Sequence, residues 1–458
     1  MSTSPGTRIC RRAFVHTTGL AAAAGVLGQA ARASGGERPN ILWLISEDHG
    51  PELGCYGTAE ARTPNLDGLA SDGARYTQAF TTAPVCSAAR SAFMTSMYQT
   101  AIGAHHHRSH RDDDYHLPEG VDVITKYFRD AGYFTANVKN AAPGVKGTCK
   151  TDWNFKPNSK PFDGDDWVQR ADGQPFFAQV NFAEAHRMGS WQHMKDPALR
   201  VTDPDKVELP PYYPDHPVVR DDWARYLDSI ALLDTKVGKV LQRLDDEGLA
   251  ENTIVVFFGD HGRAMVRGKQ WPYDSGLNMP LIIRWPGHVE PDAVCDDLVA
   301  AIDFGPTCME LAGIAPPEHL HGVPFLGPNA VQRDHVVGAR DRCDETLDRI
   351  RTVRTRRYRY IKNFMPERPY TQPNNYKENW YPPLGVLKDL HAKGELTPAQ
   401  AHFMADRKPD EELYDIQADP WETVNLANSS KHQGTLGRMR GLLDQWLEDY
   451  PDLGAIPE

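Results

Sequence analysis

Short segments made almost entirely of apolar residues are the feature of this 458-residue chain that most restricts its fold. They cover residues 40–46, 176–182, 253–258 and 280–285. A strand carries apolar side chains at nearly every position when both faces of its sheet are covered, as in parallel sheets flanked by helices. The four segments are therefore predicted to be strands of one central, mostly parallel sheet.

Helical patterns lie between these segments. Residues 222–249 carry apolar side chains at helical spacing, and Gly248 supplies a stop signal near their end. Strands that alternate with helices indicate an α/β domain, which we place at residues 38–335. Residues 336–458 differ in composition and are predicted to form a smaller C-terminal α+β subdomain that ends in an amphipathic helix at 432–450.

The first 33 residues differ from the rest in charge, because they contain four Arg and no acid while the whole chain carries a net charge of −12. Arg11 and Arg12 precede Phe14 and a modest apolar stretch, and small residues flank a cut after Ala33. This layout is typical of a twin-arginine export signal and predicts a periplasmic or secreted protein. A basic start to a cytoplasmic helix is the alternative. The stretch is too short for a stable membrane span.

The acidic balance and the cysteines each disfavour a class of function. A net charge of −12 lacks the basic footprint of a nucleic-acid binder. Six cysteines remain after the predicted signal, and no CxxC pair occurs among them, which disfavours a zinc site or a thioredoxin-like redox pair. Spacing alone leaves the disulfide connectivity open.

Polar residues follow three of the predicted strands. They are Glu47 and Asp48 after the first, His186 after the second, and Asp260 and His261 after the third. Ligands bind beyond the carboxyl ends of strands in open α/β sheets, so these residues are candidates for one site. The carboxylates suit Ca²⁺ or Mg²⁺. A single acid after a strand is more often a loop or helix cap.

A Ser- and Ala-rich segment at residues 83–96 contains a candidate reactive group. Cys86 stands where this segment is expected to begin a helix, and the N–H groups and dipole of that end favour an anion or an activated thiolate. Arg90, one turn later, adds a positive fork suited to an oxyanion. Taken alone, Cys86 also fits a buried structural cysteine.

These motifs occur in the order and spacing of the sulfatase family, which the chain resembles over most of its length. The matching segments are residues 40–48, 63–67, 86–90, 260–262, Lys269 and the tail at 412–426. The chain looks most similar to the heparan N-sulfatase (N-sulfoglucosamine sulfohydrolase) branch and its bacterial relatives. The resemblance implies an alkaline-phosphatase-like fold for the catalytic domain.

The resemblance also implies a cofactor and the residues of a catalytic site. A maturation enzyme would convert Cys86 to formylglycine, whose hydrate supplies the nucleophilic oxygen. Besides that residue, the ligands of a Ca²⁺, less readily a Mg²⁺, would be Glu47, Asp48, Asp260 and His261. The groups that bind sulfate oxygens would be Arg90, His186, Lys269 and a further lysine. One of these groups would protonate the leaving oxygen or nitrogen.

Two positions near these motifs depart from the family pattern. Ala88 stands two residues after Cys86, where Pro is usual, so a chain in which Cys86 stays a thiol is an alternative. Glu47 replaces the usual first Asp, a change of one methylene that flexible Ca²⁺ geometry absorbs.

The further lysine has two candidates. Lys150 aligns with the family lysine if residues 139–149 are an insertion, whereas Lys139 is closer in sequence spacing. We favour Lys150, although Asp152 stands where many relatives have His.

The implied substrate is a sulfated carbohydrate, with N-sulfated or O-sulfated glucosamine of heparan type favoured. The residues expected to contact it are His105, Arg340, Asp341, Arg342, Asp344 and Glu345. A metal site formed by His105–His107 is disfavoured because consecutive helical residues point in different directions. The basic segment 340–362 is predicted either to recognise a polyanionic sugar through Arg forks or to be a solvated strand face.

Two other functions fit the same residues. A phosphoesterase or phosphonate hydrolase would use the same scaffold with another substrate. A sulfated-glycan-binding protein with little catalysis would result if Cys86 stayed a thiol.

Overall fold

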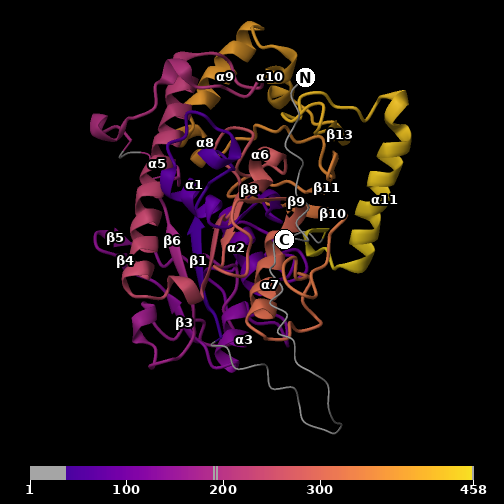
Figure 1. The fold of residues 1–458 in the computed structure, drawn as a ribbon. Helices are drawn as coiled ribbons and strands as arrows, with labels where there is room; N and C mark the ends of the chain where they lie inside the picture. The colour runs from indigo at the N-terminus through magenta and orange to yellow at the C-terminus, as the bar shows by residue number, and fades with distance from the viewer. Residues whose placement is uncertain (1–37, 189–190, 192–193, 456–458) are drawn as a thin grey trace, which may run out of the picture.

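The computed structural model describes residues 38–188, 191 and 194–455, so the predicted export signal at residues 1–33 lies outside the described chain. A seven-stranded sheet with the order β3-β6-β1-β7-β8-β2-β9 forms its centre (Figure 1). Only β8 runs antiparallel to its two neighbours, and the other neighbouring pairs are parallel. The strands are β1 (Asn40–Ser46), β2 (Ala74–Phe80), β3 (Phe134–Asn137), β6 (Phe176–Phe182), β7 (Thr253–Gly259), β8 (Asn278–Arg284) and β9 (Ala293–Ala300).

Helices cover both faces of this sheet, which explains why β1 is buried at every position. Leu42 and Leu44 face the core that includes α1 and α5, whereas Ile41, Trp43 and Ile45 face the core that includes α2, α3 and α7. The helices are α1 (Pro64–Ser71), α2 (Cys86–Thr95), α3 (Ile124–Asp130), α5 (Pro217–Asp246), α6 (Asp274–Leu277) and α7 (Phe304–Leu311). This arrangement confirms the predicted α/β class.

The apolar segments predicted the buried strands well and the half-buried ones not at all. The first two coincide with β1 and β6, and the third lacks only the last residue of β7. By contrast, β2 contains half-buried polar side chains and does not form an apolar run. The helix α5 begins five residues before the predicted start because Pro217 occupies its first turn and the His216 ring caps it by accepting from the Val218 N–H.

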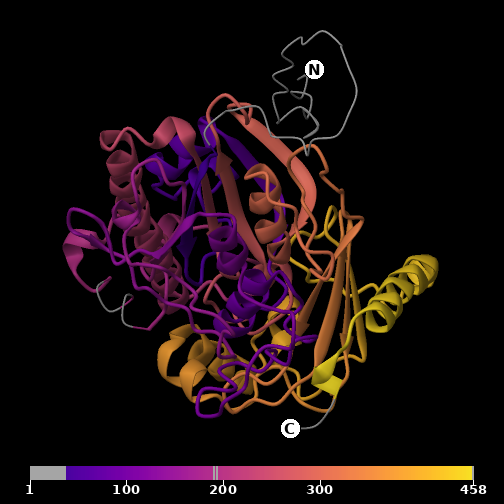
Figure 2. The same cartoon turned by 90° about the horizontal axis from the view of Figure 1, so that it is seen from below.

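A second, antiparallel sheet forms the smaller C-terminal subdomain, with the order β10-β11-β12-β13. Its helix α11 lies on the outer side of this sheet (Figure 2) and packs on β11 and β12. The elements are β10 (His335–Arg340), β11 (Ile350–Thr355), β12 (Tyr358–Asn363), β13 (Glu411–Asp415), α8 (Asn375–Trp380), α9 (Pro382–Lys393), α10 (Pro398–Ala401) and α11 (Gln433–Asp449). A small hairpin of β4 (Asn140–Ala142) and β5 (Val145–Lys146) lies beside α5.

The described helices include none that is both long and apolar enough to span a lipid bilayer.

The basic segment 340–362 is not a uniformly solvated strand face, because several of its arginines are buried while Arg356 and Arg357 stay about half exposed. Recognition of a polyanionic sugar by this segment stays a prediction. Arg351 and Arg359 are fully buried, and Arg354 is nearly so. Arg351 pairs with Asp341 at 2.9 Å and with Asp452 at 2.6 Å. Arg354 and Arg359 both bind Asp274 of the large domain. Acids distant in sequence neutralise these arginines, and no sequence pattern shows that pairing.

The Arg351 cluster predicts a large effect on stability. Arg351→Met leaves Asp341 buried without its cation and leaves Asp452 paired with Arg349 alone, so the free energy of unfolding is expected to fall by about 3–5 kcal/mol. Urea unfolding followed by fluorescence measures this change. The matched control is Arg356→Met, whose half-exposed ion pairs with Asp296 and Asp297 are worth about 1 kcal/mol or less. Equal losses in the two variants would contradict the assignment of a buried cluster.

Candidate active site

The candidate site lies at the carboxyl ends of β1, β6 and β7. Because these strands are parallel, Glu47, Asp48 and Asp260 meet at one edge of the sheet. The reversed strand β8 matters here as well. It begins at the edge where β7 ends, so the whole connection from residue 260 to residue 277 stays at that edge and brings Lys269 to the site.

The acidic side chains of the site are buried. Glu47, Asp48 and Asp260 have at most 2% of their surface exposed. Asp48 takes a left-handed backbone conformation with φ of 55°, and its N–H donates to Asp260 Oδ1 at 3.0 Å. Burial opposes the charge of Asp48, but Lys269, His186 and His261 hold the pKa of its carboxyl well below the usual value.

Cys86 begins α2, as predicted, and faces this acidic edge. Its Sγ lies 3.3 Å from His261 Nε2 and 3.7 Å from Asp48 Oδ1. All residues of α2 are buried, so the thiol and the positive end of the helix are shielded from solvent. The N–H groups at the start of the helix suit an anionic group at this position.

Three cations surround Cys86 and the carboxylates. Lys269 Nζ donates to Asp48 Oδ1 at 2.8 Å. Lys150 Nζ lies 2.5 Å from Glu47 Oε1. Arg90 donates from Nε to Asp260 Oδ2 at 3.1 Å and from Nη1 to the amide oxygen of Asn181 at 2.7 Å. The Arg90 guanidinium therefore orients the carboxylates, while the two lysine ammonium groups extend toward Cys86 from other loops.

Asp48, Cys86 and His261 form a candidate metal site, since one ligand atom from each lies within 4.8 Å of the others. His261 Nδ1 lies 2.9 Å from the Gly262 carbonyl oxygen, and a proton donated there leaves Nε2 as the metal-binding atom. Asp260 adds a buried carboxylate, with Oδ1 3.7 Å from His261 Nε2. Buried carboxylates with one imidazole fit a divalent cation. Glu47 lies among the cations instead, and its role as a ligand stays a prediction.

His186 lies at the rim of this cluster. Its Nε2 is 3.9 Å from Glu47 Oε2, and its Nδ1 is 3.1 Å from the Met188 carbonyl oxygen. The side chain is 17% exposed, so it reaches both the buried acids and solvent. This position suits a group that exchanges a proton with a leaving group.

The two candidate lysines differ clearly in position. Lys150 is largely buried against Glu47. Lys139 is exposed, and its backbone N–H bonds to the Asp165 carbonyl oxygen. The β4–β5 hairpin lies between the two residues and accounts for the extra chain length. The structure thus brings Lys150 to Cys86.

The histidine segment and the 342–344 loop meet at the start of α2. His107 Nδ1 is 2.9 Å from the Ser87 hydroxyl, and its Nε2 is 3.7 Å from Asp344 Oδ1. His106 Nδ1 accepts from the Arg342 N–H at 3.1 Å. His105 is buried against the ring of His106, with the ring centres 4.2 Å apart. The segment therefore forms a wall beside Cys86.

The predicted substrate contacts separate into two groups. Glu345 is exposed, and Asp344 is half-buried and accepts from Gln270 Nε2 at 3.2 Å. Arg340 and Asp341 are each 2% exposed. The Arg340 guanidinium stacks on the Trp271 ring at 3.7 Å, and Asp341 is paired with Arg351. Both side chains are directed into the protein, and their contact with the substrate stays a prediction.

Two residues of the site were missed from sequence. Asn181 lies within β6, where it accepts from Arg90 and donates to Asn137 Oδ1 at 3.2 Å. Arg187 binds Asp222 through both terminal nitrogens at 2.8 Å, and its backbone N–H points to Asp48 Oδ2 at 3.4 Å. A polar Asn inside an otherwise apolar strand was the available signal for the first. Arg187 follows His186 after the same strand, and this position was its local signal, but nothing near it in sequence indicates its pairing with Asp222.

Comparison with known proteins identifies the class of this chain. The family model "Sulfatase" matches residues 39–314, and the model "N-sulphoglucosamine sulphohydrolase, C-terminal" matches residues 259–371. The chain belongs to the sulfatase family, whose members are sulfuric ester hydrolases. This confirms the predicted enzyme class. The family generally uses formylglycine and a divalent metal, and the cluster around Cys86 fits both requirements.

Individual relatives support the same conclusion. An ulvan-active sulfatase of Formosa agariphila is 35% identical over 92% of this chain and 77% of its own length. Human N-sulphoglucosamine sulphohydrolase is 26% identical over 90% of both chains. A solved structure in complex with its substrate D-glucosamine-2-N,6-O-disulfate has a TM-score of 0.65 at 16% identity and covers 91% of this chain and 99% of its own.

The position of Lys150 predicts its importance for turnover. Lys150→Met removes a cation beside Cys86, and kcat for an aryl sulfate is expected to fall by about 100-fold, the size of effect seen when one donor to a developing charge is lost. Lys139→Met is the matched control and is expected to keep the kcat of the unmodified protein. Steady-state assays measure both. A larger loss in the Lys139 variant would reverse the assignment.

Proposed function

We propose that this protein is an exported, Ca²⁺-dependent sulfatase in which Cys86 is converted to formylglycine and which removes sulfate from a sulfated carbohydrate. The observation that carries the proposal is the position of Cys86, at the start of a buried helix and within reach of Asp48, His261 and two lysine ammonium groups. The matches to an ulvan-active sulfatase and to human N-sulphoglucosamine sulphohydrolase, which cover 92% and 90% of this chain, support a carbohydrate substrate.

Different residues of this chain have different roles in sulfate ester hydrolysis. Lys150 and Lys269 bind the sulfate oxygens, because their ammonium groups lie beside Cys86 and keep protons to donate. The charges of Asp48 and Cys86 outweigh burial and raise the pKa of Lys269 above its usual value, which keeps it charged. Arg90 is a positioning residue that holds Asp260 and Glu47 in place.

His186 is the proton donor in this proposal. In its protonated form the ring donates from Nδ1 to the Met188 carbonyl and carries a second proton on Nε2, the atom that faces the site. From there it protonates the leaving oxygen as the bond from sulfur to that oxygen breaks. A bound divalent metal supplies charge neutralisation and a lowered pKa for the attacking oxygen. Asp48, Asp260 and His261 are the residues that would hold it.

Ala88, which stands where the family usually has Pro, bears on whether Cys86 is converted to formylglycine. Ala88 is fully buried in the first turn of α2. Maturation enzymes therefore have to read this segment before the chain folds. A chain that keeps its thiol corresponds to the alternative of a glycan-binding protein.

Peptide mass across Cys86 tests the proposal. In protein from cells with a formylglycine-generating enzyme, the peptide is expected to carry an aldehyde in place of the thiol. Cys86→Ala is expected to lower turnover to background, and so is removal of Ca²⁺ by a chelator, with recovery on Ca²⁺ addition. Cys55→Ala, which removes a half-buried free thiol outside the site, is the control and is expected to keep full activity. A fully active protein with an intact Cys86 thiol contradicts the mechanism.

A substrate panel tests the second half of the proposal. Sulfated saccharides are expected to be hydrolysed with higher kcat/KM than matched phosphate monoesters, because the site binds a singly charged ester. The panel includes ulvan fragments, O-sulfated glucosamine and N-sulfated glucosamine, so that the sugar preference is measured directly. Faster turnover of phosphate or phosphonate esters would favour the phosphoesterase alternative.

A further inference from the structure

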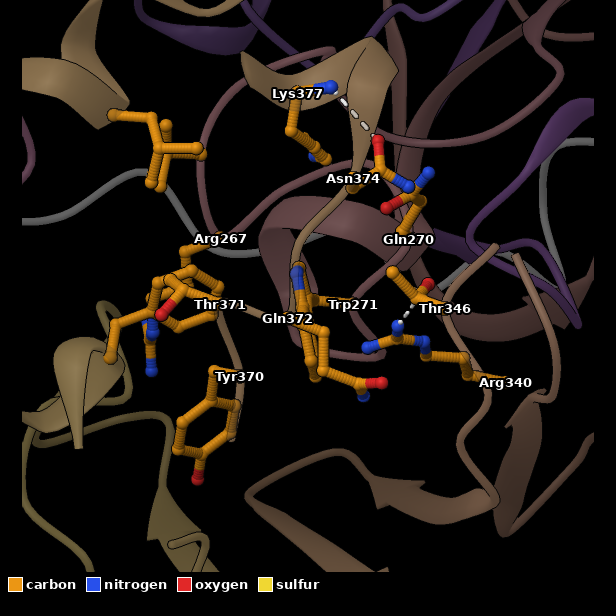
Figure 3. Close-up of a pocket in the computed structure, with 13 residues that line it drawn as sticks. Arg267, Gln270, Trp271, Arg340, Thr346, Tyr370, Thr371, Gln372, Asn374 and Lys377 are labelled. Atoms are coloured by element: carbon orange, nitrogen blue, oxygen red, sulfur yellow. Dashed lines mark hydrogen bonds between the residues drawn. The ribbon is translucent and has the colours of Figure 1, made fainter. Parts of the chain in front are cut away.

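A cavity lies behind the loop that carries Lys269, between that loop, β10 and α8 (Figure 3). Arg340 enters it from one side, and Asn374 and Lys377 from another. Trp271 and Tyr370 complete much of the apolar lining. None of the groups that we place in catalysis lines this cavity.

Arg340 brings an unsatisfied buried cation to the cavity. The side chain is 2% exposed, and only its Nη2 has a hydrogen-bond acceptor, the Thr346 hydroxyl at 3.2 Å. Nε and Nη1 have no hydrogen-bond partner among the described residues. The nearest carboxylate, Asp348, lies 3.7 Å from Nη1 and also binds Lys408 Nζ at 2.8 Å. One carboxylate is thus shared by two buried cations.

Lys377 brings a second buried amine. Its Nζ donates to the Lys269 carbonyl oxygen at 2.7 Å and lies over the Tyr381 ring at 4.2 Å. Within the described part of the chain it forms no ion pair with a carboxylate. Burial, together with the positive charges of Lys269, Arg187 and Arg340, lowers the pKa of Lys377 well below the usual value. The surroundings of Lys377 therefore carry an excess of positive charge.

Asn374 adds a third unsatisfied donor. Its Oδ1 accepts from the Lys377 backbone N–H at 2.8 Å, which fixes the orientation of the amide. The Nδ2 is buried and has no partner among the described residues. A buried donor without an acceptor costs about 1–3 kcal/mol. Nε and Nη1 of Arg340 and Nδ2 of Asn374 are three such donor atoms beside one cavity, and they indicate a missing acceptor.

We propose that this cavity binds a small inorganic anion, of the size of chloride, between Arg340, Asn374 and Lys377. An anion accepts from all three donors and balances the charge that Asp348 leaves uncompensated. The lining residues are buried apart from the half-buried Thr371 and Gln372, so the cavity is largely enclosed. We assign the anion as a free ion and not a group of the substrate, because no residue that we place in catalysis lines the cavity.

The location gives the bound anion a role in the enzyme. Lys377 donates to the carbonyl of Lys269, and the next residue, Gln270, lines the cavity. An anion that holds Lys377 charged strengthens its bond to that carbonyl. The ion then stabilises α8 against the loop that presents Lys269 to Asp48. This site is independent of the proposed substrate and of the state of Cys86.

Bromide in place of chloride tests the proposal on the unmodified full-length protein. Crystals soaked in sodium bromide are expected to show an anomalous peak within hydrogen-bond distance of Arg340 and Lys377. In solution, replacing gluconate by chloride at constant ionic strength is expected to raise the unfolding temperature along a saturation curve. Water in the cavity without a bromide peak would overturn the proposal.

Variants separate this site from the catalytic cations. Arg340→Met and Lys377→Met, made singly, are each expected to abolish the chloride-dependent rise in unfolding temperature. Lys150→Met, which removes a catalytic-site cation, is the control and is expected to keep the rise. Loss of the rise only in the Lys150 variant would place the anion at the active site and overturn the proposal. The proposal would also be overturned if chloride left the unfolding temperature unchanged and only a sulfated disaccharide raised it.

Discussion

Neutralisation of buried charge at the carboxyl edge of the sheet is the constraint on which the rest of this structure depends. Glu47, Asp48 and Asp260 are almost completely buried, and isolated carboxylates in such positions are prohibitively costly. Their cations come from three different segments: α2 supplies Arg90, the segment after the β4–β5 hairpin supplies Lys150, and the connection before β8 supplies Lys269. Charge pairing therefore fixes the positions of loops that carry the reactive groups.

The same constraint organises the smaller subdomain. Arg354 and Arg359 of the second sheet bind Asp274 of the large domain, so the two sheets are joined by ionic contacts as well as by apolar packing. Where each buried charge has an opposite charge beside it, as around Arg351, the ion pairs stabilise the fold. Where it is incomplete, as at Arg340 and Lys377, the remaining donors mark a place for a ligand. Polyanion recognition consequently cannot be read from the count of arginines in a segment.

Much of the fold follows from the sequence, for a local reason. The apolar segments of β1, β6 and β7 report burial on both faces, and polar residues at their ends indicate one edge. The start of α2 at Cys86 is also local, since the Ser/Ala run favours a helix after an extended Val85. The strands β2 and β9 were not predicted because their burial is partial. The role of Arg187 was not predicted, because its partner Asp222 belongs to another element.

The sequence by itself determined the α/β class, the candidate acids and Cys86, because strand burial and helix starts depend on neighbouring residues. The tertiary structure decided which cations serve the site. It selected Lys150 over Lys139, made Arg90 an orienting group, and turned Arg340 and Asp341 inward. These outcomes depend on contacts between segments tens to hundreds of residues apart. A buried charge is satisfied by whichever opposite charge the fold brings within a few ångströms, and periodicity along the chain carries no record of that partner.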